Sequence, residues 1–220
     1  MRTLAISANL AMILTGLVTT LVKPAQRGEL PPVLAAELVK NAGEIRQLYG
    51  IGQDWHAEFV RKLRQNTIAD FFFIASYGTM FFLLGRRLGG GYGLAVSAAS
   101  ILAAMADVVE NIGILRTICG APSDALALWT RIPSLNKWAV LGVIWILVSR
   151  LFVNFHLETF WDPVRLLTGL LYLGGGLLCL YGLLDPRKMA WAFGLVVPAT
   201  IVQIVVFWFD KGFWRPTVLP

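Results

Sequence analysis

The hydrophobic positions of this chain fall into six long runs, and short segments rich in charged residues separate them. Each run is about 20 residues long, and a helix of that length crosses a hydrocarbon core of roughly 30 Å. The runs lack the alternation of about ten residues that marks a transmembrane β-strand. We therefore predict an all-α polytopic membrane helix bundle with six spans: Leu4 to Val22, Thr67 to Leu84, Gly91 to Leu115, Trp138 to Leu157, Arg165 to Leu184 and Met189 to Phe209.

The largest segment between spans covers about residues 23–66. Apolar residues recur with helical spacing from Val33 to Tyr49, which predicts an amphipathic helix with Glu37 on its polar face. A glycine-containing break follows, and a second helix is predicted to run without interruption from about Asp54 to Leu84. The segment is expected to form a helical hairpin at one membrane face, either as an interfacial element or as a lid over a pocket. No internal repeat divides the chain, so we predict one integral membrane domain over residues 1–220.

The composition excludes an ordinary soluble domain, because 57% of the residues are hydrophobic and only 15% are charged. A formal net charge of +6 would indicate a nucleic-acid partner in a soluble protein. Here the basic residues flank the spans, where they favour contact with lipid headgroups. Membrane lipids are therefore expected partners, and nucleic acid is not.

Two carboxylates and an amide interrupt the third span. Asp107, Glu110 and Asn111 are related by i, i+3 and i+4 spacing, so they share one arc of the helix. A charge inside hydrocarbon costs at least ~2.5 kcal/mol on insertion scales, so these groups need partners, protons, water or metal. Small residues between Ser97 and Ala104 continue the same stripe and would let another helix approach closely. The polar patch is therefore predicted to point into the bundle.

The neighbouring spans supply partners for this patch. A short turn near Leu88 makes the second and third spans an antiparallel hairpin, which places Asp70 at about the depth of Asp107. Arg116 and Lys137 are predicted at the ends of the third and fourth spans, on the same side of the membrane. The predicted ligand or proton site consists of Asp70, Tyr77, Asp107, Glu110, Asn111, Arg116 and Lys137.

Three roles fit such a cluster. Close carboxylates do not both stay ionised cheaply, so one of them would carry a proton, as proton-coupled transport or acid and base chemistry requires. The oxygen ligands would also suit Mg²⁺, Mn²⁺ or Ca²⁺, although we assign no metal site. Finally, Lys137 and Arg116 would neutralise the acids in a network that only fixes the fold. No cofactor is identified, and the motifs of common hydrolases and ATP-driven proteins are absent.

The pattern Arg64-x-Asn-x-x-x-Asp70-Phe-x-Phe-x-x-x-Tyr77, together with Asp107-Val-Val-Glu-Asn111 and Lys137, resembles small bacterial multi-span membrane proteins. The likeness covers about 75 residues, from the second span to the fourth, and implies no activity. It does favour a multi-pass protein of the bacterial inner membrane.

Three functions remain open from the sequence. The leading hypothesis is a protein that binds a small or amphiphilic, lipid-like ligand at the acidic site and couples binding to transport or conversion through a protonatable carboxylate. The second is a non-catalytic accessory subunit that docks a membrane partner subunit or a second copy of itself. The third is a membrane-embedded enzyme acting on a lipid or isoprenoid substrate.

Overall fold

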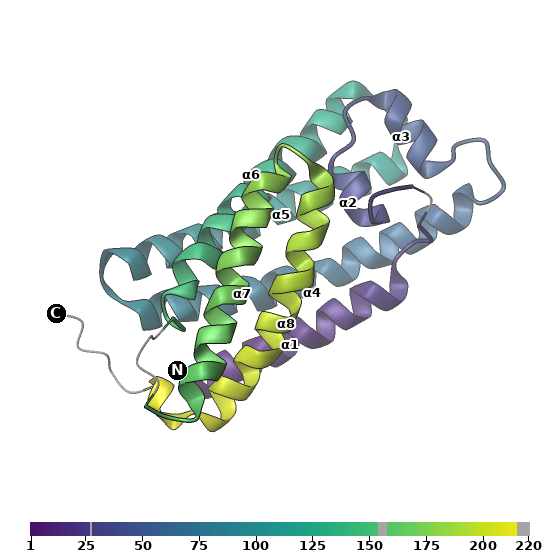
Figure 1. Ribbon diagram of the computed structural model, residues 1–220. Coiled ribbons are helices and arrows are strands. Elements are labelled where there is room, and N and C mark those ends of the chain that lie inside the picture. Colours follow the sequence, from purple (N-terminus) through teal and green to yellow (C-terminus); the bar gives the residue numbers. More distant parts are fainter. Residues whose placement is uncertain (27, 154–157, 215–220) are drawn as a thin grey trace.

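A computed structural model describes residues 1–26, 28–153 and 158–214, and over these residues the chain is helical with no strand. Six of the described helices are long and apolar enough to cross a membrane (Figure 1). The all-α multi-pass prediction is therefore confirmed. The six are α1 (Arg2–Val22), α4 (His56–Leu88), α5 (Gly90–Cys119), α6 (Asp124–Ser149), α7 (Trp161–Gly182) and α8 (Pro186–Phe209).

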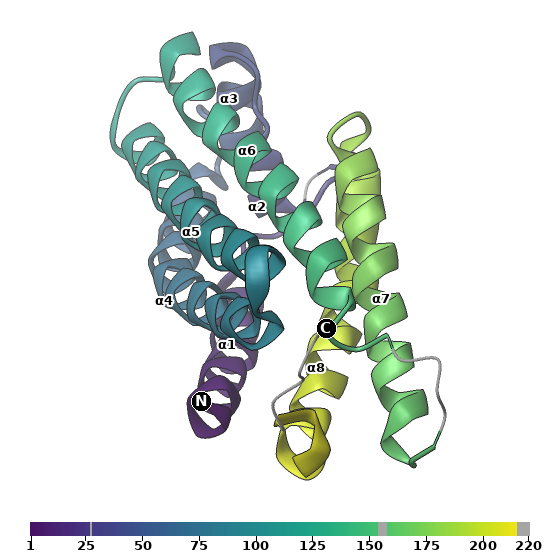
Figure 2. The same cartoon turned by 90° about the vertical axis from the view of Figure 1, so that its left-hand side faces the viewer.

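The long helices pack against one another in chain order, and α8 returns to contact α1 (Figure 2). Buried aromatic side chains fill the space that they enclose. The Phe81 and Tyr172 rings lie 6.4 Å apart, and Phe152 stacks on Phe207 and on Phe213. Phe213 belongs to the short 3₁₀ helix η1 (Lys211–Trp214), which folds back under the bundle at the end farthest from α2 and α3.

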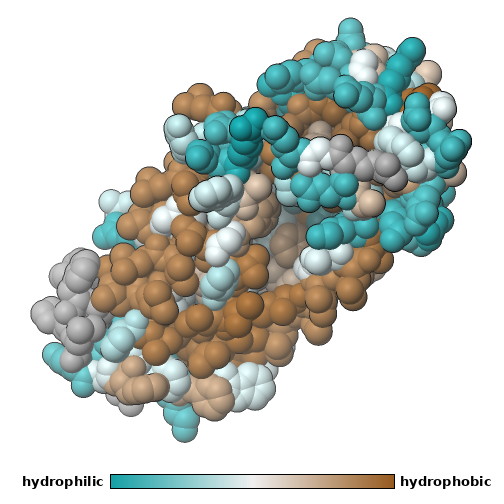
Figure 3. Space-filling model, turned by 45° about the vertical axis from the view of Figure 1, so that its right-hand side comes forward, coloured by the Kyte–Doolittle hydropathy of each residue, from teal (hydrophilic) through white to brown (hydrophobic). Residues whose placement is uncertain are grey.

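One end of the bundle is polar, whereas its long body is apolar. Two short helices, α2 (Pro32–Glu37) and α3 (Ala42–Tyr49), join the adjoining ends of α4, α5 and α6 at the polar end. Figure 3 shows hydrophilic side chains gathered at this end and hydrophobic ones along the body. The 33 residues of α4 make a helix about 50 Å long, which is longer than a hydrocarbon core of roughly 30 Å. The N-terminal part of α4 therefore extends beyond the apolar body into the polar end.

Glycine lets α4 and α5 pack with their backbones in close contact. The two helices are joined by a turn at Gly89, which has the positive φ of 71° that favours glycine. Beyond it, a Cβ atom built on Gly93 would lie 2.3 Å from the Gly85 carbonyl oxygen. On the other side of the contact, the Ser97 hydroxyl donates to the Phe82 carbonyl. This close approach sets the register that brings the polar residues of the two helices to one level.

The Gly93→Ala variant is expected to lower the thermal unfolding midpoint of the detergent-solubilised protein. The added methyl group meets backbone rather than a flexible side chain, and overpacking of this kind costs about 1–3 kcal/mol. Gly91→Ala is the matched control, because a Cβ at that position meets nothing within 4 Å. Equal midpoints for the two variants would show that the helices do not approach as closely as described.

The amphipathic helix predicted from Val33 to Tyr49 is two helices in the structure. The first ends at Glu37, and the second begins after Asn41, whose side chain accepts a hydrogen bond from the Glu44 backbone N–H. An Asn side chain at this position caps a new helix, so the helical spacing of apolar residues continues across a real break. The longer helix predicted from about Asp54 is confirmed as α4, which begins at His56.

The fourth span lies earlier in the sequence than predicted. Instead of starting at Trp138, α6 starts at Asp124, where the Ser123 side chain caps it by accepting from the Leu126 N–H, and it ends at Ser149. Hydropathy alone misses its first half because polar residues are mixed into that half. Residues 154–157 of the predicted span lie outside the described part. As a result Lys137 lies in the middle of α6 and not at its end.

Candidate functional site

The ammonium group of Lys137 lies among three carboxylates in the interior of the protein. Its Nζ atom is 3.0 Å from Asp107 Oδ1, 2.8 Å from Glu110 Oε2 and 3.3 Å from Glu37 Oε1. The side chains are at most 7% exposed. The ammonium donates hydrogen bonds to Asp107 Oδ1 and Glu110 Oε1, and its contact with Glu37 is an ion pair.

Two hydrogen bonds between α4 and α5 extend this arrangement. The Tyr77 hydroxyl donates to Asp107 Oδ2 over 2.9 Å, and Asn111 Nδ2 donates to Asp70 Oδ2 over 2.9 Å. Asp70 is only half-buried, unlike the other acids. Asp107 and Asn111 are one turn apart on α5, so the two sets adjoin. We call Glu37, Asp70, Asp107, Glu110 and Lys137, with the donors Tyr77 and Asn111, the acidic cluster.

Glu37 reaches the cluster from outside the spans, and sequence reasoning missed it. It lies at the end of α2, and its Oε2 atom accepts from Trp138 Nε1 over 2.8 Å and from Ser134 Oγ over 3.2 Å. We assigned Glu37 to the polar face of a longer helix, but α2 ends at this residue and its side chain turns inward. One signal was available, since Glu37 is the only charged residue between Val33 and Val39.

Of the seven predicted site residues, six lie in the cluster and Arg116 does not. Arg116 is exposed, and its guanidinium lies 5.2 Å from the ring centre of Trp129. The prediction placed Lys137 at a helix end beside Arg116. Because Lys137 is in mid-helix, Arg116 is left near the end of α5, away from the carboxylates.

The charges of the cluster do not balance. It holds four carboxyl groups and one ammonium, so full ionisation would leave a net charge of −3. Tyr77, Asn111, Ser134 and Trp138 donate hydrogen bonds to the acids but carry no charge. Burial of an unpaired carboxylate costs several kcal/mol. The described contacts therefore leave the acids to be neutralised by protons or by a bound cation.

The position that a bound divalent cation would take between these acids is filled by the ammonium. Among the residues that the structure describes, no group of three or more His, Cys, Asp or Glu side chains is arranged to hold a metal ion. The remaining acid, Asp70, is paired with Asn111.

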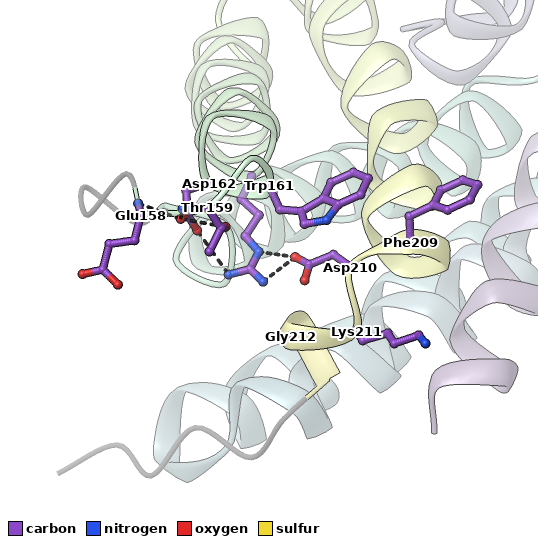
Figure 4. Close-up of a pocket in the computed structure, with 9 residues that line it drawn as sticks. Glu158, Thr159, Trp161, Asp162, Phe209, Asp210, Lys211 and Gly212 are labelled. Atoms are coloured by element: carbon purple, nitrogen blue, oxygen red, sulfur yellow. Dashed lines mark hydrogen bonds and ion pairs between the residues drawn. The ribbon is translucent and has the colours of Figure 1, made fainter.

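A second polar site lies at the opposite end of the bundle, where α7 begins and α8 ends (Figure 4). Arg165 forms ion pairs there with Asp162 and Asp210, and the Trp161 and Phe209 rings stack 6.3 Å apart beside them. These residues line a cavity of about 590 Å³. Since its one arginine is held between two aspartates, we interpret this site as an ionic contact that joins α7 to α8.

Comparison with known proteins finds no matching family, no similar curated protein and no similar solved structure. Function must therefore be argued from the site itself.

Proposed function

We propose that this protein binds a small or amphiphilic ligand at the Asp70 side of the acidic cluster, and that proton exchange by the cluster couples binding to transport or conversion. We assign it to the inner membrane of a bacterium, the location that the motif resemblance implies. The observation that carries the proposal is the excess of three carboxyl groups over the single ammonium at a buried position.

Burial and charge together support the proton part of the proposal. Asp107, Glu110 and Glu37 all turn toward one Nζ atom, and a single positive charge compensates only one of them. A carboxyl group that cannot ionise cheaply holds a proton at neutral pH and releases it when a cation or a new hydrogen-bond donor arrives. Such a group can therefore link proton exchange to ligand binding.

The different exposure of the acids supports a ligand at Asp70. Asp107, Glu110 and Glu37 are buried, whereas Asp70 is half-buried and only its Oδ2 atom bonds to a described residue. Its Oδ1 atom is the acceptor in the cluster best placed to meet an incoming molecule. Glu37 connects the same cluster to α2, so movement of the polar end would change the environment of the buried acids.

Native mass spectrometry of protein extracted in mild detergent tests the proposal. The wild-type protein is expected to retain a bound small molecule or amphiphile that Asp70→Asn does not retain. Asp54→Asn is the matched control, because Asp54 is exposed outside the spans. Identical spectra for wild type and Asp70→Asn, with detergent and bulk lipid alone, would contradict the proposal.

A second candidate is the accessory subunit, and the pairing of Lys137 favours it. Its ammonium donates to Asp107 and Glu110 and forms an ion pair with Glu37, as in a network that serves only to fix helix register. In that case a stoichiometric partner chain would co-purify with the protein, and Asp70→Asn would leave both the partner and the bound molecules unchanged.

A further inference from the structure

An apolar groove runs along the outer surface of the seam between α4 and α5. Its volume is about 510 Å³, and Ile74, Gly78 and Phe82 of α4 line it opposite Ala104 and Val108 of α5. The groove extends from Ile74 to Phe82, which corresponds to roughly 12 Å along the helix. Several of its lining side chains are exposed on the apolar body of the bundle, so the groove opens toward the hydrocarbon.

Asp70 and Asn111 do not line the groove but lie one helical turn beyond it on their helices. Ile74 is one helical turn from Asp70 on the same stripe of α4, and Val108 is one turn from Asn111 on α5. The two helices are antiparallel and tightly packed, with a Cβ built on Gly78 only 3.3 Å from the Ala104 methyl group. The apolar groove and the half-buried Asp70 carboxylate therefore lie one after the other along the contact between α4 and α5.

The hydrogen bonds of the cluster specify the kind of group that Asp70 would receive. Lys137 donates to Asp107 and Glu110, the Tyr77 hydroxyl to Asp107 and the Trp138 N–H to Glu37. Carboxyl oxygens outnumber these donors, and Oδ1 of Asp70 has no partner among the residues described. A hydrogen-bond donor complements this acceptor, whereas a carboxylate or phosphate would add like charge to a negative site.

We propose that the groove holds the tail of a single-chain amphiphile whose head group donates a hydrogen bond to Asp70. The head would be a protonated amine or an alcohol, and the tail would lie between α4 and α5 over the length of the groove. This inference rests on the proposed function and names the ligand class of the same site. Charge complementarity at Asp70 selects this occupant over a helix of a second copy, which brings no donor to the carboxylate.

Photolabelling of the full-length protein in lipid nanodiscs tests the groove. Three straight-chain probes of equal length, each with a diazirine near the tail end, carry an amine, an alcohol or a carboxylate head. The amine and the alcohol are expected to label the peptides that line the groove on α4 and α5 in a saturable manner. Asp70→Asn should reduce the saturable labelling by the amine roughly tenfold, as for the loss of a hydrogen bond to a charged group.

A substitution within the groove tests the tail contact independently of the head-group contact at Asp70. Ala75 lines the groove and is exposed, so Ala75→Leu should fill it and abolish labelling there without disturbing the cluster. Ala98→Leu is the matched control, because Ala98 is exposed on α5 and does not line the groove. The Ala98→Leu variant should be labelled like the wild type.

The outcomes distinguish this inference from the proposed function. Equal labelling of the groove by all three probes, independent of Asp70, would mean ordinary lipid contact and would overturn the inference. Labelling that depends on Asp70 but lies away from α4 and α5 would contradict the inference that the groove holds the tail. It would leave the proposed ligand site at Asp70 supported. If no binding depends on Asp70, both the groove inference and the proposed ligand site are overturned. Cross-links between the grooves of two copies, unaffected by the amine, would assign the groove to a dimer contact.

Discussion

Lys137→Met is expected to destabilise the folded protein by about 3–5 kcal/mol at neutral pH, the largest effect of any single substitution that we predict. Methionine keeps much of the length of the side chain but removes the only buried positive charge among the described residues. The thermal unfolding midpoint in detergent measures the effect. Lys211→Met is the matched control, because Lys211 is exposed, and its midpoint should differ little from that of the wild type.

The loss in Lys137→Met should depend on pH in a definite direction. Without the ammonium, the folded state requires additional protons on Asp107 or Glu110, the two acids that accept hydrogen bonds from it. The unfolded chain does not need them, so the penalty is largest at alkaline pH and shrinks as the pH falls. Adding Asp107→Asn and Glu110→Gln to Lys137→Met should recover much of the midpoint at neutral pH. A midpoint that is insensitive to both pH and these additions would contradict the charge imbalance.

Arg165→Met is expected to have the second largest effect on stability. The substitution removes the cation that pairs closely with Asp210, and removal of one partner from a buried pair is costly. Asp162 keeps its hydrogen bonds from Glu158 and Thr159. The Arg165 side chain is 18% exposed, so the effect should be smaller than that of Lys137→Met. The thermal unfolding midpoint again measures the loss.

The Arg187 and Glu29 pair supplies the control for this prediction. Their side chains are 66% and 73% exposed, and exposed ion pairs contribute roughly 0–1 kcal/mol. Arg187→Met should therefore shift the midpoint far less than Arg165→Met. Equal shifts would show that the site at the end of α7 is open to water and contributes little to the joining of α7 and α8.

The sequence was sufficient for the six spans and for most of the cluster because both follow from hydropathy and helix geometry. The turn at Gly89 makes α4 and α5 antiparallel and brings Asp70 to the acidic cluster. The register differs by one turn from the prediction, because Asp70 pairs with Asn111 and Tyr77 takes the place opposite Asp107. The i, i+3 and i+4 spacing then places Asp107 and Glu110 on the side of α5 that meets Lys137. Side-chain spacing and the pairing of helices across a short turn are local properties, so they can be predicted from a single sequence.

The errors arose where tertiary contacts override local patterns. The first half of α6 mixes polar with apolar residues and was interpreted as a loop, which moved Lys137 to a helix end and brought Arg116 wrongly beside it. Glu37 was placed on a solvated face because the end of α2 at that residue is set by packing and by the Asn41 cap that follows. The orientation of a side chain at a helix end depends on these contacts, which cannot be predicted from the spacing of hydrophobic residues.

Infrared spectroscopy of the protein in lipid at neutral pH tests the central claim most directly. Exposed Asp and Glu side chains are ionised under these conditions, so only retained protons give the carbonyl stretching band of a carboxylic acid. The wild-type protein is expected to show that band, with a shift in deuterium oxide, and to lose intensity in Glu110→Gln but not in Asp54→Asn. A wild-type spectrum with no such band would mean that all four acids of the cluster are ionised around a single ammonium, which would contradict the proton-holding site that we propose.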